Sequence, residues 1–199
     1  MTDYQVIFVH IPRTAGRSIS AALGLDFAKE HRTIKDYIKE LTEPVVRNIF
    51  KFTVVRNPWE RAVSCWSYFH VCTHSKYINH SAVNFNVWVA NGGEGLLDEL
   101  HYCKNDRGEV LINSFLKFET VERDFLPIAQ KFNVSTVLPK IGEDKQEQIE
   151  KIKVQGIYVD GRPPVTLTEN YKDMYESQKT IDIVGSMNEK LIADFGYTF

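Results

Sequence analysis

The sequence predicts an α/β domain in which helices flank a central parallel β-sheet. Two short apolar runs, residues 4–9 (YQVIFV) and 50–55 (FKFTVV), are rich in β-branched and aromatic side chains and predict buried strands. A helical pattern follows each run, over residues 17–23 and again from Asn57 onward. This repeated order of strand, loop and helix is typical of βαβ units, whose strands lie parallel.

Local signals fix the expected ends of these elements. Gly24 is expected to end the first helix, and a second helix over residues 33–41 is expected to end before Pro44. In Asn57-Pro58-Trp59-Glu60, Asn57 is a typical N-cap and Pro58 a typical first helical residue. Beyond residue 72 we expect helices over 84–91, 120–132 and 178–195, a strand over 111–118 and a solvent-exposed helix over 144–153.

Composition limits the classes of function. The chain has 199 residues with 24 basic and 26 acidic side chains, so it lacks the basic excess of proteins that coat nucleic acid or an anionic membrane. No linker or repeat divides it, which predicts one domain over residues 1–199 with a divergent segment at about 73–110. Three cysteines without a CxxC pair predict neither a disulfide framework nor a metal site. Without a signal-peptide pattern or a long apolar stretch, we expect a cytoplasmic protein.

The first strand-to-helix turn has the features of an anion site. Residues 10–18 (HIPRTAGRS) combine small residues with two arginines and two hydroxyls just before a helix. Backbone N–H groups at such a turn bind phosphate or sulfate well. A Walker A loop would require Gly and Lys where this chain has Ile11 and Arg17. The alternative is an ordinary helix start with solvated arginines.

The second strand-to-helix turn brings further donors to the same edge of the predicted sheet. Arg56 ends the second strand, and Ser64 lies only about 20° around the helix axis from Asn57 at 100° per residue. Arg61 is about 40° from Asn57 by the same measure. Ligands of open parallel sheets bind beyond the carboxyl ends of the strands, so both turns face one predicted crevice. The alternative is that Arg61 pairs with a carboxylate and Ser64 is merely small.

Together the two turns resemble a known family. HIPRTAGRS is similar to the 5′-phosphosulfate loop, and VVRNPWERAVS to the 3′-phosphate motif, of sulfotransferases that use 3′-phosphoadenosine 5′-phosphosulfate (PAPS). The resemblance is to carbohydrate sulfotransferases of the chondroitin and heparan 2-O type and their bacterial relatives. It continues through residues 115–125 (FLKFETVERDF) and 194–199 (DFGYTF). It implies a P-loop-like three-layer sandwich, the sulfotransferase fold.

The resemblance also implies roles for residues of both turns. Arg56 and Ser64 would hold the 3′-phosphate, and Trp59 would either stack on adenine or pack in the core. The 5′-phosphosulfate would be held by the first loop, through Arg13, Thr14, Ala15, Gly16, Arg17 and Ser18.

Two departures from the family pattern affect this assignment. Arg13 stands where relatives commonly have Lys, and a guanidinium cannot donate a proton at neutral pH, so its stabilisation of the leaving group would be electrostatic. The Arg-Lys-Gly stretch that contacts the 3′-phosphate in cytosolic sulfotransferases is absent. Its replacement could come from Lys151, Lys153 or Arg162, although a solvated face is the simpler interpretation.

An acceptor hydroxyl needs a base, and His31 is the first candidate. It follows the first helix, where similar sulfotransferases often carry a histidine that faces the acceptor. Glu30 is the carboxylate alternative, and His10 is expected to brace the first loop. Weaker candidates are His70, His74, His80 and His101.

The resulting hypothesis is an enzyme that moves the sulfuryl group of PAPS to a hydroxyl acceptor, expected to be a saccharide, and releases adenosine 3′,5′-bisphosphate (PAP). No metal, nucleic acid or membrane partner is expected, and the oligomeric state is not predicted. One alternative is a nucleotide or small-molecule kinase, which Ile11 and Arg17 disfavour. Another is a non-catalytic module that binds PAP or a sulfated glycan.

Overall fold

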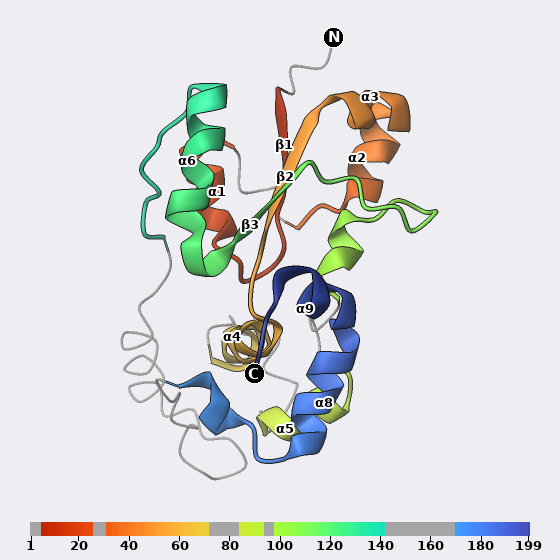
Figure 1. Cartoon of the computed structure of the whole chain (residues 1–199), viewed down its shortest axis with the longest axis vertical. Coiled ribbons are helices and arrows are strands. Elements are labelled where there is room, and N and C mark those ends of the chain that lie inside the picture. The colour runs from red at the N-terminus through yellow and green to blue at the C-terminus, as the bar shows by residue number, and fades with distance from the viewer. Residues whose placement is uncertain (1–4, 26–30, 72–83, 94–97, 142–169) are drawn as a thin grey trace. The chain divides into compact units, whose positions relative to one another are not determined.

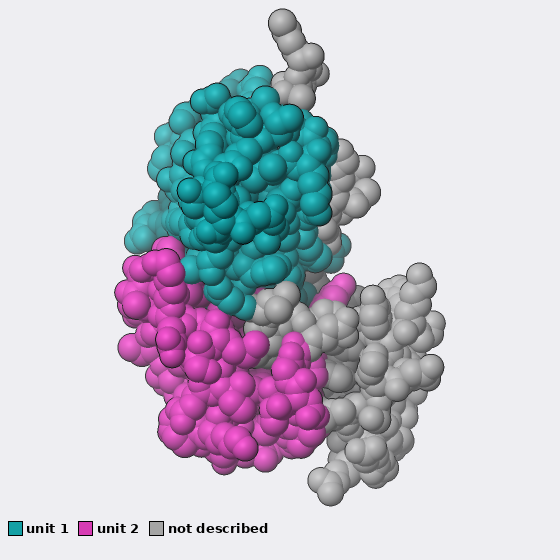
Figure 2. Space-filling view, turned by 90° about the vertical axis from the view of Figure 1, so that its right-hand side faces the viewer, with its two compact units in different colours: residues 1–56, 98–141 teal, residues 57–97, 142–199 magenta. Residues whose placement is uncertain are grey.

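The computed structural model describes residues 5–25, 31–71, 84–93, 98–141 and 170–199. The chain forms two compact units (Figure 2). Unit 1 comprises residues 1–56 and 98–141, and unit 2 comprises residues 57–97 and 142–199. Neither unit is one continuous stretch of chain. The expected single domain over residues 1–199 stays a prediction.

Unit 1 contains a parallel sheet of three strands in the order β1-β2-β3. The strands are β1 (Val6–Val9), β2 (Phe50–Val55) and β3 (Ser114–Lys117). The central strand is the most buried, as its continuous apolar run predicts. The strands predicted over 4–9, 50–55 and 111–118 are confirmed, the first and third with shorter bounds.

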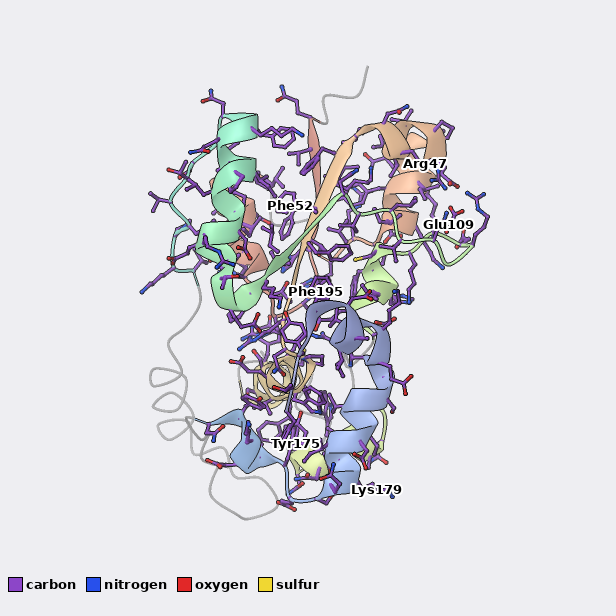
Figure 3. All side chains as sticks on the ribbon, viewed as in Figure 1. Arg47, Phe52, Glu109, Tyr175, Lys179 and Phe195 are labelled. Carbon is purple, nitrogen blue, oxygen red and sulfur yellow. The ribbon has the colours of Figure 1, made fainter. Side chains whose placement is uncertain are left out.

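Helices lie on both sides of this sheet, so unit 1 has three layers (Figure 1). On one side are α1 (Gly16–Ala22) and α6 (Val121–Phe132), and on the other α2 (Ile34–Leu41) and α3 (Glu43–Asn48). Phe52, labelled in Figure 3, is fully buried between β2 and α6 and lies 6.1 Å from Phe125, ring to ring. The predicted α/β class, with a parallel sheet flanked by helices, is therefore confirmed.

The start of α2 is fixed by a reciprocal cap, and its end at Leu41 is the predicted one, whereas the place of Pro44 needs correction. Thr33 Oγ1 accepts from the Asp36 N–H at 3.3 Å, and Asp36 Oδ2 accepts from the Thr33 N–H at 2.9 Å. Pro44 does not close this helix but lies in the first turn of α3. A proline is tolerated there because a helix leaves its first N–H groups unpaired.

Lys51 joins β2 to the end of α3. Its side chain is buried, and Nζ donates to the carbonyls of Val46, Arg47 and Ile49 at 2.9, 3.2 and 2.5 Å. Burial, followed by the nearby charge of Arg47, lowers the pKa of Lys51. At the protein surface, Arg47 of α3 forms an ion pair with Glu109, so α3 is also held to the loop that precedes β3 (Figure 3).

The described residues of unit 2 are helical. They form the α-helices α4 (Pro58–Val71), α5 (Phe85–Ala90), α8 (Gln178–Met187) and α9 (Glu189–Phe195), with a 3-10 turn at Tyr171–Met174. They enclose an aromatic core that includes Trp59, Trp66 and Phe85. Asn84 caps α5 by accepting from the Asn86 N–H, and the helix expected over 84–91 is confirmed with shorter bounds.

The helix predicted over residues 178–195 is two helices, divided at Asn188. In a continuous helix the Asn188 N–H would donate to the Val184 carbonyl, but here it donates to Gly185. The Asn188 side-chain amide donates to the Val184 carbonyl instead, at 3.0 Å. The helix expected over 144–153 lies outside the described residues. Among the residues that are described, no helix is long and apolar enough to cross a membrane.

Candidate functional site

The first loop, residues 10–18, connects β1 to α1 in a conformation that bends its backbone sharply. Arg13 and Ala15 adopt left-handed backbone angles, with φ of 68° and 63°. Thr14 is fully buried, and its hydroxyl donates to the Ile11 carbonyl at 2.7 Å, so its side chain holds the loop itself. Ala15 gives α1 no side-chain cap, which suits a site where backbone N–H groups meet an anion.

His10 sets the shape of this loop from within. Only 7% of its surface is exposed, and a Cβ atom placed on Gly16 would lie 1.6 Å from its Nε2 atom. Gly16 is therefore required by the close approach of the imidazole, and the expectation that His10 braces the loop is confirmed. Burial, then the charges of His31 and Arg13, lower the pKa of His10 to about 3, so it is neutral at pH 7.

Arg56 brings the end of β2 into contact with the first loop. Its side chain is 8% exposed, and Nη1 donates to the backbone carbonyl of Arg13 at 3.1 Å. The guanidinium also lies over the Phe118 ring, with Cζ 4.1 Å from the ring centroid. β1 and β2 are neighbouring parallel strands, so the residues that follow them share one edge of the sheet. The first loop and Arg56 are therefore in contact at this edge.

Glu99 is a buried group at this edge that the sequence analysis did not identify. Its carboxylate accepts a hydrogen bond from the Arg56 N–H at 3.1 Å, directly after β2 ends. It begins a 3-10 helix, Glu99–Cys103, whose first turn is capped by Asp98. The sequence signal for this short helix was Asp98, a typical N-cap residue. It was not used because it lies at the edge of a segment without clear periodicity.

His31 is exposed, and its ring lies 4.4 Å from that of His10, centroid to centroid. The proposed base is thus next to the residue that braces the first loop. Glu30, its carboxylate alternative, lies outside the described residues. Arg17 is exposed and Ser18 half-buried at the start of α1, where the sequence places them beside the loop.

Ser64 and Trp59 belong to α4 in unit 2. Trp59 is buried in the core of that unit, where its Nε1 donates to the Ile181 carbonyl at 3.0 Å and its ring meets Phe199 edge-on. These contacts favour packing over adenine stacking for Trp59. Ser64 is half-buried. Asn57 caps α4 as predicted, since its Oδ1 accepts from the N–H groups of the second and third following residues at 3.1 and 3.3 Å.

Arg61 and His101 are the remaining candidates whose side chains the structure describes. Arg61 is buried within unit 2, where Nη1 lies 3.8 Å from Cys65 Sγ. His101 is exposed on the 3-10 helix at 99–103. No group of three metal-ligating side chains occurs among the residues that the structure describes. Five further candidates lie outside the described residues: His74, His80, Lys151, Lys153 and Arg162. For His70 the structure describes the backbone in α4 and not the side chain.

The profile of the Sulfotransferase family matches residues 1–198, almost the whole chain. The chain therefore belongs to the sulfotransferase family and is an enzyme that transfers sulfuryl groups. Members of this family generally use PAPS as the sulfate donor and a hydroxyl-bearing molecule as the acceptor. No curated protein and no solved structure matches the chain significantly.

Proposed function

We propose that this sulfotransferase takes its sulfuryl group from PAPS and transfers it to a hydroxyl of a saccharide. The observation that carries the donor assignment is the contact between Arg56 and the first loop. It holds the Arg56 side chain to the backbone of Arg13, so two cationic residues come from one edge of the sheet, where a parallel sheet binds its ligand. PAPS carries a 5′-phosphosulfate and a 3′-phosphate, and a pair of neighbouring cationic positions fits that charge distribution.

Each phosphate has its own residues in this proposal. The first loop holds the 5′-phosphosulfate through Arg13, Arg17, Ser18 and the backbone N–H groups of Thr14, Ala15 and Gly16. Arg56 holds the 3′-phosphate, and the resemblance of VVRNPWERAVS to the 3′-phosphate motif assigns Ser64 to the same phosphate. Because Thr14 uses its hydroxyl within the loop, its part is limited to its backbone N–H.

PAPS supplies an activated sulfuryl group, which separates from the 5′-phosphate oxygen as the acceptor oxygen bonds to sulfur. His31 takes the proton of the acceptor hydroxyl in this step, since an imidazole is an effective base near pH 7. Arg13 stabilises the negative charge that grows on the departing phosphate oxygen. It does so without donating a proton, because a guanidinium remains charged at neutral pH.

The saccharide acceptor rests on the resemblance of both turns to carbohydrate sulfotransferases. Incubation with radiolabelled PAPS and a panel of oligosaccharides, phenols and steroids tests it. Label should enter an oligosaccharide, and labelling of a phenol or steroid alone would contradict the saccharide assignment.

Substitution of the base tests the mechanism in the same assay. His31→Ala should reduce kcat by about 10²–10⁴-fold and leave the affinity for PAP within about twofold of wild type. His101→Ala is the comparison, because His101 is also an exposed histidine of unit 1. A loss of turnover with His101→Ala but not with His31→Ala would overturn the assignment of the base.

A further inference from the structure

Phe118 and Arg56 occupy equivalent positions directly after two neighbouring strands. In the register of the sheet Val55 of β2 pairs with Lys117 of β3, and Arg56 and Phe118 are the residues that follow this last pair. Parallel strands lie about 4.8 Å apart, so the side chains that follow paired residues are close enough to stack. The guanidinium carbon of Arg56 accordingly lies 4.1 Å from the centroid of the Phe118 ring.

The corner that carries Phe118 is held in place by Asp124. The carboxylate of Asp124 accepts hydrogen bonds from the Lys117 N–H at 3.3 Å and from the Thr120 hydroxyl at 2.6 Å. These two donors lie on either side of Phe118 in the chain. The Phe118 side chain is half-buried and packs against the core of unit 1. The ring is therefore a fixed surface on which the Arg56 side chain rests.

Stacking and hydrogen bonding together define the orientation of the guanidinium. The guanidinium carbon of Arg56 lies over the Phe118 ring, and all N–H donors of a guanidinium lie in the plane of the group. The hydrogen bond from Nη1 to the Arg13 carbonyl then fixes the rotation within that plane. A planar donor group held in this way can recognise a phosphate at one defined position.

We propose that Phe118 is a positioning residue that orients Arg56 for the 3′-phosphate, and that it thereby sets the preference for 3′-phosphorylated nucleotides. The inference rests on the proposed function, in which Arg56 binds that phosphate. It extends that function to a residue that contacts neither the donor nor the acceptor in the proposal.

Calorimetric titration with PAP and with 5′-AMP, which lacks the 3′-phosphate, tests this role. Phe118→Leu should weaken PAP binding by about 5- to 30-fold, the range expected for loss of a cation–π contact. Its affinity for 5′-AMP should stay within about twofold of wild type. Phe118→Tyr keeps the ring face and should retain the wild-type preference for PAP.

Phe50→Leu is the matched control. Phe50 is another half-buried aromatic residue of unit 1, it lies at the opposite end of β2, and its ring stacks with the Lys131 ammonium at 4.2 Å. This variant should leave the ratio of the two affinities unchanged. If Phe118→Leu fails to fold, Phe118→Met fills a similar volume without a ring and takes its place.

The same titrations distinguish an error in the role of Phe118 from an error in the proposed binding of the 3′-phosphate by Arg56. If wild-type protein binds PAP no better than 5′-AMP, the assignment of Arg56 to the 3′-phosphate is wrong. If wild type prefers PAP and Phe118→Leu weakens both ligands equally, or neither, then Phe118 has only a structural role and the inference is overturned.

Discussion

Arg56 Nη1 donates a hydrogen bond of 3.1 Å to the backbone carbonyl of Arg13, a residue 43 positions earlier in the chain. The bond connects the ends of β2 and β1, which are adjacent in the sheet. Each arginine thus has a role beyond its charge. Arg13 supplies the carbonyl that orients Arg56, and Arg56 donates to a loop residue whose backbone is left-handed, with φ of 68°.

Arg13→Ala should lower kcat by about 10²–10³-fold, because charge on the departing phosphate oxygen would lose its nearest cation. The carbonyl that Arg56 uses remains in this variant, so PAP affinity should fall much less than kcat. Arg107→Ala is the control, since Arg107 is exposed and pairs with Glu43 on the surface. Steady-state kinetics with PAPS would contradict the role of Arg13 if the alanine variant kept more than half of its turnover.

Gly16→Ala should destabilise the protein by about 1–3 kcal/mol or more, because the new Cβ would overlap His10. The double variant with His10→Ala should recover much of this loss, and the two substitutions should therefore not be additive. Gly185→Ala in α8 is the control, because its Cβ would meet Trp59 at an ordinary 3.4 Å. Urea unfolding of the four variants measures these energies; additive losses at positions 10 and 16 would show that the contact is unimportant.

The low pKa of His10, about 3, makes stability depend on pH. Between pH 6.5 and 3 the unfolded chain binds a proton at this imidazole and the folded protein does not, so stability falls as pH falls. Each pH unit in that range costs about 1.4 kcal/mol from this group. His10→Asn should therefore lose less stability than wild type between pH 7 and pH 4.5, as measured by urea unfolding at both values. Equal losses in the two proteins would mean that His10 is protonated in the folded state.

Lys51→Met should lower the free energy of unfolding by about 2–3 kcal/mol, because three carbonyls at the end of α3 would lose a charged donor in a buried place. Arg47→Ala removes exposed ion pairs from the same helix and should cost less than about 1 kcal/mol. Thermal unfolding of both variants tests the difference. A smaller effect at Lys51 than at Arg47 would contradict it.

Much of the fold was predictable, because its signals are local. Asn57 before a proline predicts the start of α4, and the apolar run at 50–55 predicts the central strand. The end of α2 before Pro44 was predicted, but α3 was not, because a proline fits both after a helix and within the first turn of the next one. The break at Asn188 depends on a side-chain hydrogen bond that amphipathic spacing does not reveal.

The sequence predicted which residues lie at the site better than it predicted the hydrogen bonds between them. The order of the motif residues indicated Arg13 and Arg56, but the bond between them depends on strand register. Glu99 was missed because its partner, the Arg56 N–H, is distant in the sequence. Trp59 had two interpretations until its contacts with Ile181 and Phe199 favoured the core of unit 2.

The central claim is that the edge formed by the first loop and Arg56 binds PAP, and a thermal-shift titration tests it directly. Ligand at about 100 times its dissociation constant adds roughly 2.7 kcal/mol of stability. PAP should raise the melting temperature of the wild-type protein, Arg56→Ala should abolish that shift, and Arg107→Ala should retain it. A shift with ATP and magnesium but not with PAP, or no shift with either, would contradict the account.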